Sequence, residues 1–340
     1  MIRIQHPRLD EWAMSLYHDF FVKDGYEAKL QACANDPIWT PDQADFLRYL
    51  LARGEAVVAG RPYRLASIVD HIKRTYKGKR KIFNVVVDRK TKKCRLKTAL
   101  QDIYNYGTFS SNDRLKWGAY YLTERLQVTV CPYCNRQFTT TYHSKEGRTR
   151  PQLDHFYDKA THPYLAVSFF NLIPSCYVCN ANLKGKKLFT LQTHMHPYEE
   201  GFGERRKFGI EFKAKTNEAI DYVGIFEGKW DGFKIAFRDD PTLDKQHPYW
   251  IRANNNCNVF KIKEFYNEHK DYASDLILKA RVYNDEHIRQ LMSSFPELFP
   301  TEADVVRLIS GAPMKEEEYP RRTLSKLTMD LIDDLKLRFV

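Results

Sequence analysis

The stretch that decides the fold contains two cysteine pairs, Cys131-Pro132-Tyr133-Cys134 and Cys176-Tyr177-Val178-Cys179. Each pair has the spacing of a zinc knuckle, in which two thiolates bind one ion. Four thiolates complete the tetrahedron that structural zinc prefers and leave no position open for a substrate. A single Cys-x-x-Cys could also be a redox pair or two unrelated buried cysteines. Two such pairs in one short segment favour a closed structural zinc site.

The other cysteines, Cys33, Cys94 and Cys257, bring the total to seven. An odd count argues against a disulfide framework, and we expect these three to be unpaired structural thiols. No apolar run approaches the ~18–20 residues that cross a bilayer. The first residues, 1–8, lack the apolar core of a signal peptide. We therefore expect a cytoplasmic protein that does not engage a membrane.

The segment between the cysteine pairs, residues 135–175, is longer than the ~15–20 residues of a simple zinc ribbon. It contains Asp154-His155 and, further on, Asn171, while Asn180 follows the second cysteine pair directly. Asp-His, then Asn, then Cys-x-x-Cys-Asn with trailing lysines resembles the HNH endonuclease motif, which is a ββα-metal fold. The resemblance implies a nuclease core that a four-cysteine zinc site stabilises.

The resemblance also implies roles for single residues. In that family the first histidine follows a metal-binding acid at the end of a strand, a middle asparagine braces the loop, and a third histidine or asparagine lies on a helix. These catalytic positions correspond to Asp154, His155, Asn171 and Asn180. Asparagine at the third position departs from the name of the motif but is common in the family. Its neutral oxygen suits Mg²⁺ or Mn²⁺, which Asp154 and Asn180 are expected to hold.

Phosphodiester hydrolysis makes sense of these residue types. A neutral His155 can act as general base and take a proton from water, because the ordinary histidine pKa of ~6.5 is near working pH. A single magnesium ion between Asp154 and Asn180 would act as a Lewis acid on the phosphate. The zinc has a separate purpose, because Cys179 is the neighbour of Asn180 and fixes the start of its helix.

Further stretches extend the resemblance over roughly residues 125–340. Residues 164–176 and 196–202 are similar to HNH nucleases found beside ABC-type ATPases in bacterial anti-phage systems. Together with residues 254–256 and 324–327, they resemble the PtuB-type nucleases of Septu and related retron systems. The resemblance implies an effector that a PtuA-like ATPase partner holds in check. The chain has no Gly-x-x-x-x-Gly-Lys-[Ser/Thr] loop, so any nucleotide dependence must come from elsewhere.

Charge points to a polyanionic partner. The 340 residues carry a formal net charge of +11. Between Asp70 and Leu100, twelve lysines and arginines face two aspartates, an excess nearly equal to the net charge of the whole chain. Such a concentration favours contact with nucleic acid over a merely solvated face. The expected contact residues are Lys79, Arg80, Lys81, Lys184, Lys186 and Lys187.

Periodicity predicts an α+β fold that is mainly helical. Three regions are expected: a basic, helical region at 1–125, the zinc-stabilised HNH core at 126–200, and a mixed, then helical region at 201–340. Thr40-Pro41 predicts a helix start. The expected strands are 82–87, 128–130, 138–142, 208–212 and 233–237. Leu324, Leu327, Leu331 and Leu335 predict a final helix with one apolar face.

Three alternatives stay open. Metal-assisted cleavage neither requires nor excludes a 2′-hydroxyl, so the chain could be an effector that cuts RNA or tRNA, although DNA is favoured. It could be a stand-alone restriction or homing-type DNase that uses the basic 70–100 stretch for recognition. It could also be a zinc-stabilised nucleic-acid-binding module without catalysis. The joint presence of Asp154, His155 and Asn180 weighs against the last alternative.

Overall fold

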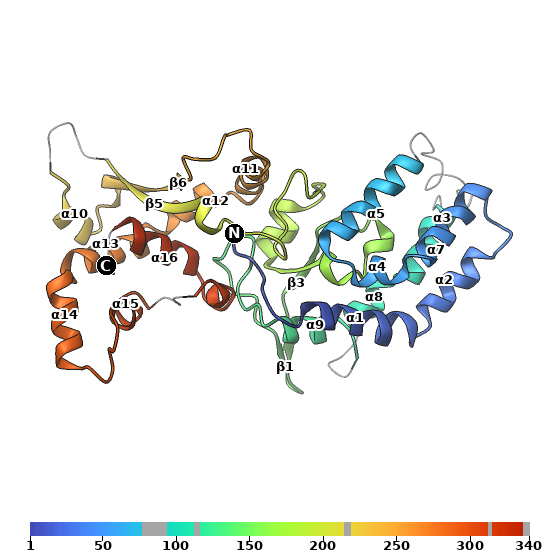
Figure 1. Ribbon diagram of the computed structural model, residues 1–340, viewed down its shortest axis with the longest axis horizontal. Coiled ribbons are helices and arrows are strands. Elements are labelled where there is room, and N and C mark those ends of the chain that lie inside the picture. Colours follow the sequence, from blue (N-terminus) through green and yellow to red (C-terminus); the bar gives the residue numbers. More distant parts are fainter. Residues whose placement is uncertain (77–93, 112–115, 214–218, 312–314, 336–340) are drawn as a thin grey trace. The chain divides into compact units, whose positions relative to one another are not determined.

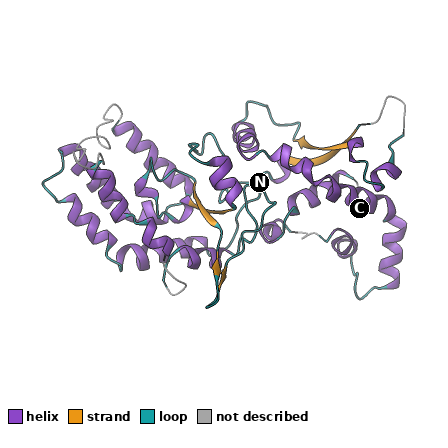
Figure 2. Cartoon of the chain, turned by 180° about the vertical axis from the view of Figure 1, so that it is seen from behind, coloured by secondary structure: helices purple, strands orange, loops and turns teal. Residues whose placement is uncertain are grey.

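The computed structural model describes residues 1–340 except 77–93, 112–115, 214–218, 312–314 and 336–340. The described chain is α+β and mainly helical, with three two-stranded antiparallel sheets, which confirms the expected class (Figure 2). Among its helices, none combines the length and apolar character needed to cross a lipid bilayer. Contacts divide the chain into two compact units. The first unit comprises Gln5–Val128 and Thr139–Glu199; the second comprises Met1–Ile4, Thr129–Phe138 and Glu200–Val340.

The first unit begins with a series of helices (Figure 1). They are α1 (Leu9–Ser15), the π-helix η1 (Leu16–Val22), α2 (Tyr26–Ala34), α3 (Pro41–Leu51), α4 (Gly54–Ala59), α5 (Pro62–Thr75), α7 (Arg95–Ile103), α8 (Tyr106–Ser111) and α9 (Ala119–Leu126). The expected start at Thr40-Pro41 is confirmed. Thr40 and Gln43 form a reciprocal capping box, in which each side chain accepts a hydrogen bond from the other's backbone N–H. The fully buried Phe46, Leu47 and Leu50 then place α3 against the core of this unit.

Short strands follow in the same unit. They are β1 (Tyr142–His143), β2 (Arg148–Thr149), β3 (Gln152–His155) and β4 (Leu172–Ser175), with the 3-10 turns η2 (Pro163–Leu165) and η3 (Phe169–Asn171) before β4 and the π-helix η4 (Val178–Lys184) after it. β3 pairs with β4, so that Asp154 lies opposite Ile173 and His155 opposite Leu172. β4 is buried along its whole length, which fixes the register of the pair. The order is therefore strand, strand, helix.

The second unit combines one longer strand pair with helices. Its elements are η5 (Gly203–Arg205), β5 (Arg206–Phe212), α10 (Tyr222–Phe226), η6 (Trp230–Gly232), β6 (Phe233–Asp239), α11 (Pro248–Phe260), α12 (Ile262–Tyr266), η7 (Asn267–His269), α13 (Lys270–Val282), α14 (Asp285–Ser294), α15 (Glu302–Ser310), η8 (Glu316–Arg321) and α16 (Ser325–Asp334). The expected strands at 208–212 and 233–237 and the final helix are confirmed. Leu327 and Leu331 on α16 are fully buried.

Helix α16 covers the free edge of β5. The Asp330 carboxylate accepts the backbone N–H of Phe208 at 2.9 Å, and the Asp334 carboxylate accepts that of Ile210 at 2.7 Å. Side-chain oxygens thus replace the neighbouring strand that these N–H groups would otherwise need. A Cβ at Gly209, which lies between them, would come within 2.7 Å of the Arg238 side chain and 2.9 Å of the Asp334 carboxylate. An exposed sheet edge is in this way satisfied within the chain.

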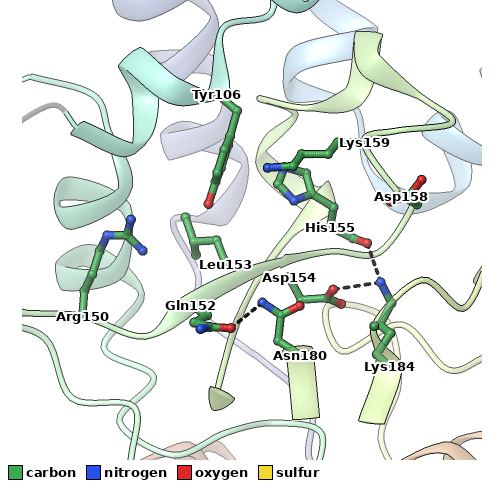
Figure 3. A pocket seen from close by; sticks show the side chains of 11 residues that line it. Tyr106, Arg150, Gln152, Leu153, Asp154, His155, Asp158, Lys159, Asn180 and Lys184 are labelled. Carbon is green, nitrogen blue, oxygen red and sulfur yellow. Dashed lines mark hydrogen bonds and ion pairs between the residues drawn. The ribbon is translucent and has the colours of Figure 1, made fainter. Parts of the chain in front are cut away.

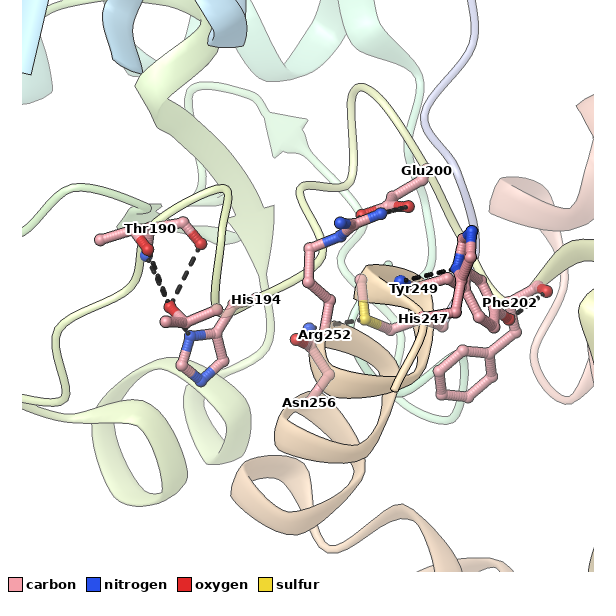
Figure 4. A network of polar contacts seen from close by, with 10 residues as sticks. Thr190, His194, Glu200, Phe202, His247, Tyr249, Arg252 and Asn256 are labelled. Carbon is pink, nitrogen blue, oxygen red and sulfur yellow. Dashed lines mark hydrogen bonds and ion pairs between the residues drawn. The ribbon is translucent and has the colours of Figure 1, made fainter. Parts of the chain in front are cut away.

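Helix α11 contacts residues 200–202, at the start of the 200–340 segment of the second unit. Arg252 forms a two-pronged ion pair with Glu200, at 2.5 and 2.8 Å (Figure 4). The Tyr249 hydroxyl donates to the carbonyl of Phe202 at 2.7 Å. Both contacts are within the second unit and hold residues 200–202 against one face of the helix.

Asn135 links the first cysteine pair to the C-terminal part of the second unit. Its backbone is left-handed, with φ +51°, and its side chain is fully buried. The amide oxygen accepts the backbone N–H of Lys326 at 3.0 Å, and the amide nitrogen donates to the carbonyl of Arg322 at 3.1 Å. Its own carbonyl accepts the N–H of Leu324 at 2.7 Å. Asn135 thereby provides hydrogen-bond partners for several backbone groups just before α16 and in its first turn.

The two compact units do not coincide with the three regions expected from the sequence. Region 1–125 lies, except for its first four residues, in one unit with 139–199, and the expected core 126–200 is divided between the two units. The expected strands at 128–130 and 138–142 are reduced to one bridge between Val130 and Phe138 and to the two-residue β1. The expected strand at 82–87 lies outside the described residues. Short polar-flanked strands carry too little local signal to separate them from loop.

Replacing Asn135 by alanine is expected to lower the free energy of unfolding by about 2–3 kcal/mol, because several buried backbone groups lose their partner. Denaturant unfolding measures the loss. Gln127→Ala is the matched control, since Gln127 is also left-handed (φ +49°) but exposed. Equal losses for the two variants would attribute the effect to backbone strain rather than to the Asn135 hydrogen bonds.

Candidate active site and cysteine cluster

Cys131, Cys134, Cys176 and Cys179 form a cluster that could hold a zinc ion. Their sulfur atoms all lie within 4.8 Å of one another, and all four residues are buried. Each pair has the local form of a knuckle. The backbone N–H of Asn135 bonds to the carbonyl of Cys131 at 2.7 Å, and that of Cys179 points at the Cys176 sulfur at 3.4 Å. Four thiolates in this arrangement match the tetrahedral donor set of zinc.

A pocket in the first unit collects several of the residues singled out in the sequence. It has a volume of about 350 Å³. Strand β3, helix η4 and helix α8 all contribute side chains, as Figure 3 shows. The lining residues are Tyr106, Arg150, Gln152, Leu153, Asp154, His155, Asp158, Lys159, Asn180, Lys184 and Gly185. Asp154, His155 and Asn180 thus meet at one cavity, although Asn180 is 25 or more residues from the other two in the sequence.

His155 is held as a neutral imidazole. Its Nε2 lies 3.0 Å from the carbonyl oxygen of Ala166. A carbonyl can only accept, so Nε2 carries the proton and Nδ1 keeps the lone pair. Burial, together with the positive charge of Lys159, lowers the pKa of His155 to about 3. The ring also meets Tyr106 edge to face, with 4.6 Å between the ring centres. At neutral pH the residue is therefore an oriented proton acceptor.

Asp154 is a buried carboxylate with a buried cationic partner. Its Oδ1 lies 2.8 Å from Nζ of Lys184, and the two side chains are only 3% and 2% exposed. The same Nζ donates to the backbone carbonyl of His155 at 2.7 Å. Burying a carboxylate this deeply is costly without such a partner. Lys184 thus holds Asp154 in position.

Asn180 presents an oxygen beside Asp154. Its amide nitrogen donates to Oε1 of Gln152 at 2.8 Å, which orients the amide. In Figure 3 its side chain lies between those of Gln152 and Asp154. A carboxylate and an amide oxygen side by side are a donor set that fits a hard divalent cation such as Mg²⁺ or Mn²⁺. Two neighbouring acceptors also repel each other unless a cation lies near them.

Asn171 supports the site from outside the pocket. The fully buried side chain accepts the N–H of Tyr157 at 2.7 Å. It donates to the carbonyls of Tyr157 and Leu165, at 3.1 and 2.9 Å. These three bonds hold the loop that follows His155, including the segment that presents the carbonyl of Ala166. Asn171 is a positioning residue here and does not line the cavity.

The lysines expected to contact nucleic acid lie in different surroundings. Lys186 and Lys187 are exposed, as expected of such residues. Lys184 is not a surface lysine: its ammonium is buried against Asp154, because its position on η4 directs it inward. Lys79, Arg80 and Lys81 lie outside the described residues. Contact with nucleic acid stays a prediction for the whole set.

Sequence reasoning missed several lining residues, among them the polar or aromatic Tyr106, Arg150, Asp158 and Lys159. Arg150 donates to Ser110 on α8 at 2.7 Å, and Lys159 lies 4.4 Å from the ring centre of Tyr106. Spacing offered a weak signal, since Asp158 and Lys159 follow His155 by three and four residues. Tyr106 comes from a helix distant in sequence and offered none. Together with Lys184, Arg150 and Lys159 give the cavity three cationic side chains against the carboxylates of Asp154 and Asp158, and hence an affinity for anions.

Comparisons with protein-family models, with curated proteins and with solved structures found no match to this chain.

Changing Cys179 to serine is expected to remove zinc from the purified protein and to lower its melting temperature. Elemental analysis should give one zinc per chain for the unchanged protein and a clear loss for the variant, because serine is a poor zinc ligand. Cys94→Ser is the matched control, since Cys94 lies outside the cluster. Undiminished zinc in Cys179→Ser would contradict a four-cysteine site.

Proposed function

We propose that the pocket is the active site of an HNH-type endonuclease that hydrolyses phosphodiester bonds, with DNA the favoured substrate. The observation that carries the proposal is the convergence of Asp154, His155 and Asn180 in one cationic cavity. A strand pair followed by a helix supplies all three, in the order that the HNH resemblance implies. The proposal therefore rests on chemistry and arrangement together.

In this proposal His155 takes the proton from the attacking water. Its Nε2 is engaged by the Ala166 carbonyl, so Nδ1 is the accepting atom. Low basicity keeps the imidazole neutral until a phosphodiester enters. The negative charge of that phosphate then favours the imidazolium and strengthens the base as the reaction begins. Asn171 holds the loop that fixes this geometry.

Asp154 and Asn180 would hold the divalent cation, Mg²⁺ or Mn²⁺. When bound, the cation supplies Lewis-acid stabilisation of the charge that develops on the phosphate and on the leaving oxygen. Arg150 and Lys159 line the same cavity and attract the phosphate. The cysteine cluster takes no part in the chemistry: with zinc bound, it would fix the start of η4 and so the place of Asn180.

The chain is also proposed to act in anti-phage defence under the control of an ABC-type ATPase partner. The PtuB-type resemblance of residues 125–340 supports this part of the proposal, and the absence of a phosphate-binding loop from the sequence agrees with it. Purification together with the products of neighbouring genes tests it. An ATPase that co-elutes with the chain and lowers its cleavage rate is the expected result; unaltered cleavage in its presence would contradict control by that partner.

His155→Ala is expected to reduce cleavage by at least about a hundredfold, because general-base catalysis contributes that much or more. Duplex DNA, single strands and total tRNA, each with and without Mg²⁺, are the substrates for the assay. His71→Ala is the matched control, since His71 is exposed on α5 and does not line the pocket.

Each outcome separates the alternatives. Preferred cleavage of tRNA would replace DNA by RNA as the substrate, and cutting at one DNA sequence by the isolated chain would favour a stand-alone DNase. A protein that binds nucleic acid, cuts none of it and loses nothing in His155→Ala would contradict the enzyme and leave a zinc-stabilised binding module.

A further inference from the structure

Asp154, which would bind the divalent cation in the proposed function, is already paired with the cationic side chain of Lys184. Lys184 Nζ lies 2.8 Å from Asp154 Oδ1 and 2.7 Å from the His155 carbonyl. With the lysine 2% exposed, this ammonium is a built part of the cavity and not a chance surface contact. It comes from η4, the helix that also carries Asn180. The lysine and the candidate metal ligand therefore share one element.

Charge balance sets a condition on this site. Arg150, Lys159 and Lys184 already outnumber Asp154 and Asp158 in the cavity. A divalent ion added beside the Lys184 ammonium would bring two cations onto one buried carboxylate. Repulsion at such a short separation is strong where water is scarce. Asp154 can therefore bind the divalent cation only weakly while the Lys184 ammonium remains in contact with it.

We propose that Lys184 is the resting counter-ion of Asp154 and that a divalent cation takes its place on this carboxylate. The exchange keeps a cation on the buried carboxylate before and after the divalent ion binds, and removing one partner of a buried ion pair is costly. The ammonium is freed into the same cavity, where it joins Arg150 and Lys159. The inference rests on the proposed function for the identity of the incoming ion.

The exchange links metal binding to phosphate binding. A freed Lys184 adds one cationic group for an anion, and a bound phosphodiester offsets the excess positive charge left by the metal. Each ligand should therefore raise the affinity for the other. Without an anionic substrate the site would bind divalent ions more weakly, and Lys184 acts on the reaction through Asp154 as a positioning residue.

Metal binding by Lys184→Gln tests the competition. Removing a unit charge a few ångströms from a dication should strengthen Mn²⁺ binding by at least about tenfold. Free Mn²⁺ is measured by electron paramagnetic resonance on the full chain, in buffer cleared of divalent ions and without a chelator. Lys186→Gln is the matched control, since Lys186 is exposed two residues further on and loses the same charge. Equal affinity in Lys184→Gln and the unchanged protein, or no Mn²⁺ binding by either, would overturn the inference.

A second measurement needs no variant. Acetylation by an N-hydroxysuccinimide ester, followed by mass spectrometry, should label Lys184 at least about tenfold more slowly than Lys186 while Lys184 is paired and buried. Mn²⁺, at concentrations where resonance shows it bound, should raise the Lys184 rate several-fold and leave the Lys186 rate unchanged. Bound Mn²⁺ with an unchanged Lys184 rate would overturn the inference, even if Lys184→Gln does not fold.

These readouts are independent of catalysis. In one possible outcome the protein cuts no nucleic acid, Lys184→Gln binds Mn²⁺ more tightly, and Mn²⁺ exposes Lys184 in the unchanged protein. This outcome would contradict the nuclease and support the exchange. His155-dependent cleavage together with a Mn²⁺ affinity that does not depend on Lys184 would support the nuclease and contradict the exchange.

Discussion

A charged carboxylate buried to 3% exposure is the constraint on which the candidate site depends. An aspartate in that position costs several kcal/mol unless a cation and hydrogen bonds compensate it. The fold supplies the compensation from one helix: η4 brings Lys184 onto Asp154 and places Asn180 beside it. The strand pair β3–β4 holds the carboxylate from the other side, in a register that the fully buried β4 fixes.

The surroundings of Asp154 explain why helix η4 must begin and end where it does. The second cysteine pair stands at its start, and Asn180 is the residue next to Cys179. At its end Gly185 has a left-handed φ of +50°, which a side chain would disfavour, and this glycine also lines the pocket. The seven residues of η4 thus carry the Cys179 thiolate, the Asn180 amide and the Lys184 ammonium. A shift of this order by one position would separate these groups from the places they occupy.

The sequence was a good guide where its signals are local. Cysteine spacing predicted the four-sulfur cluster, Thr40-Pro41 predicted the start of α3, and alternating or helical apolar patterns predicted β5, β6 and α16. The same reasoning failed for Lys184, because trailing lysines suggest a surface and nothing local tells that one of them turns inward. Tyr106 was missed because α8 reaches the cavity through tertiary packing, in which Arg150 contacts Ser110 of α8 forty positions away. The division into two interleaved units also depends on long-range contacts, which composition does not reveal.

Anomalous diffraction from crystals grown with Mn²⁺ and a short oligonucleotide would locate both metals and the substrate in one experiment. We expect two distinct metal peaks: zinc among the four cysteine sulfurs, and manganese within bonding distance of Asp154 and Asn180 oxygens, with Lys184 turned toward a phosphate. Manganese bound elsewhere, with Lys184 still on Asp154 and the oligonucleotide remote from the pocket, would contradict this expectation.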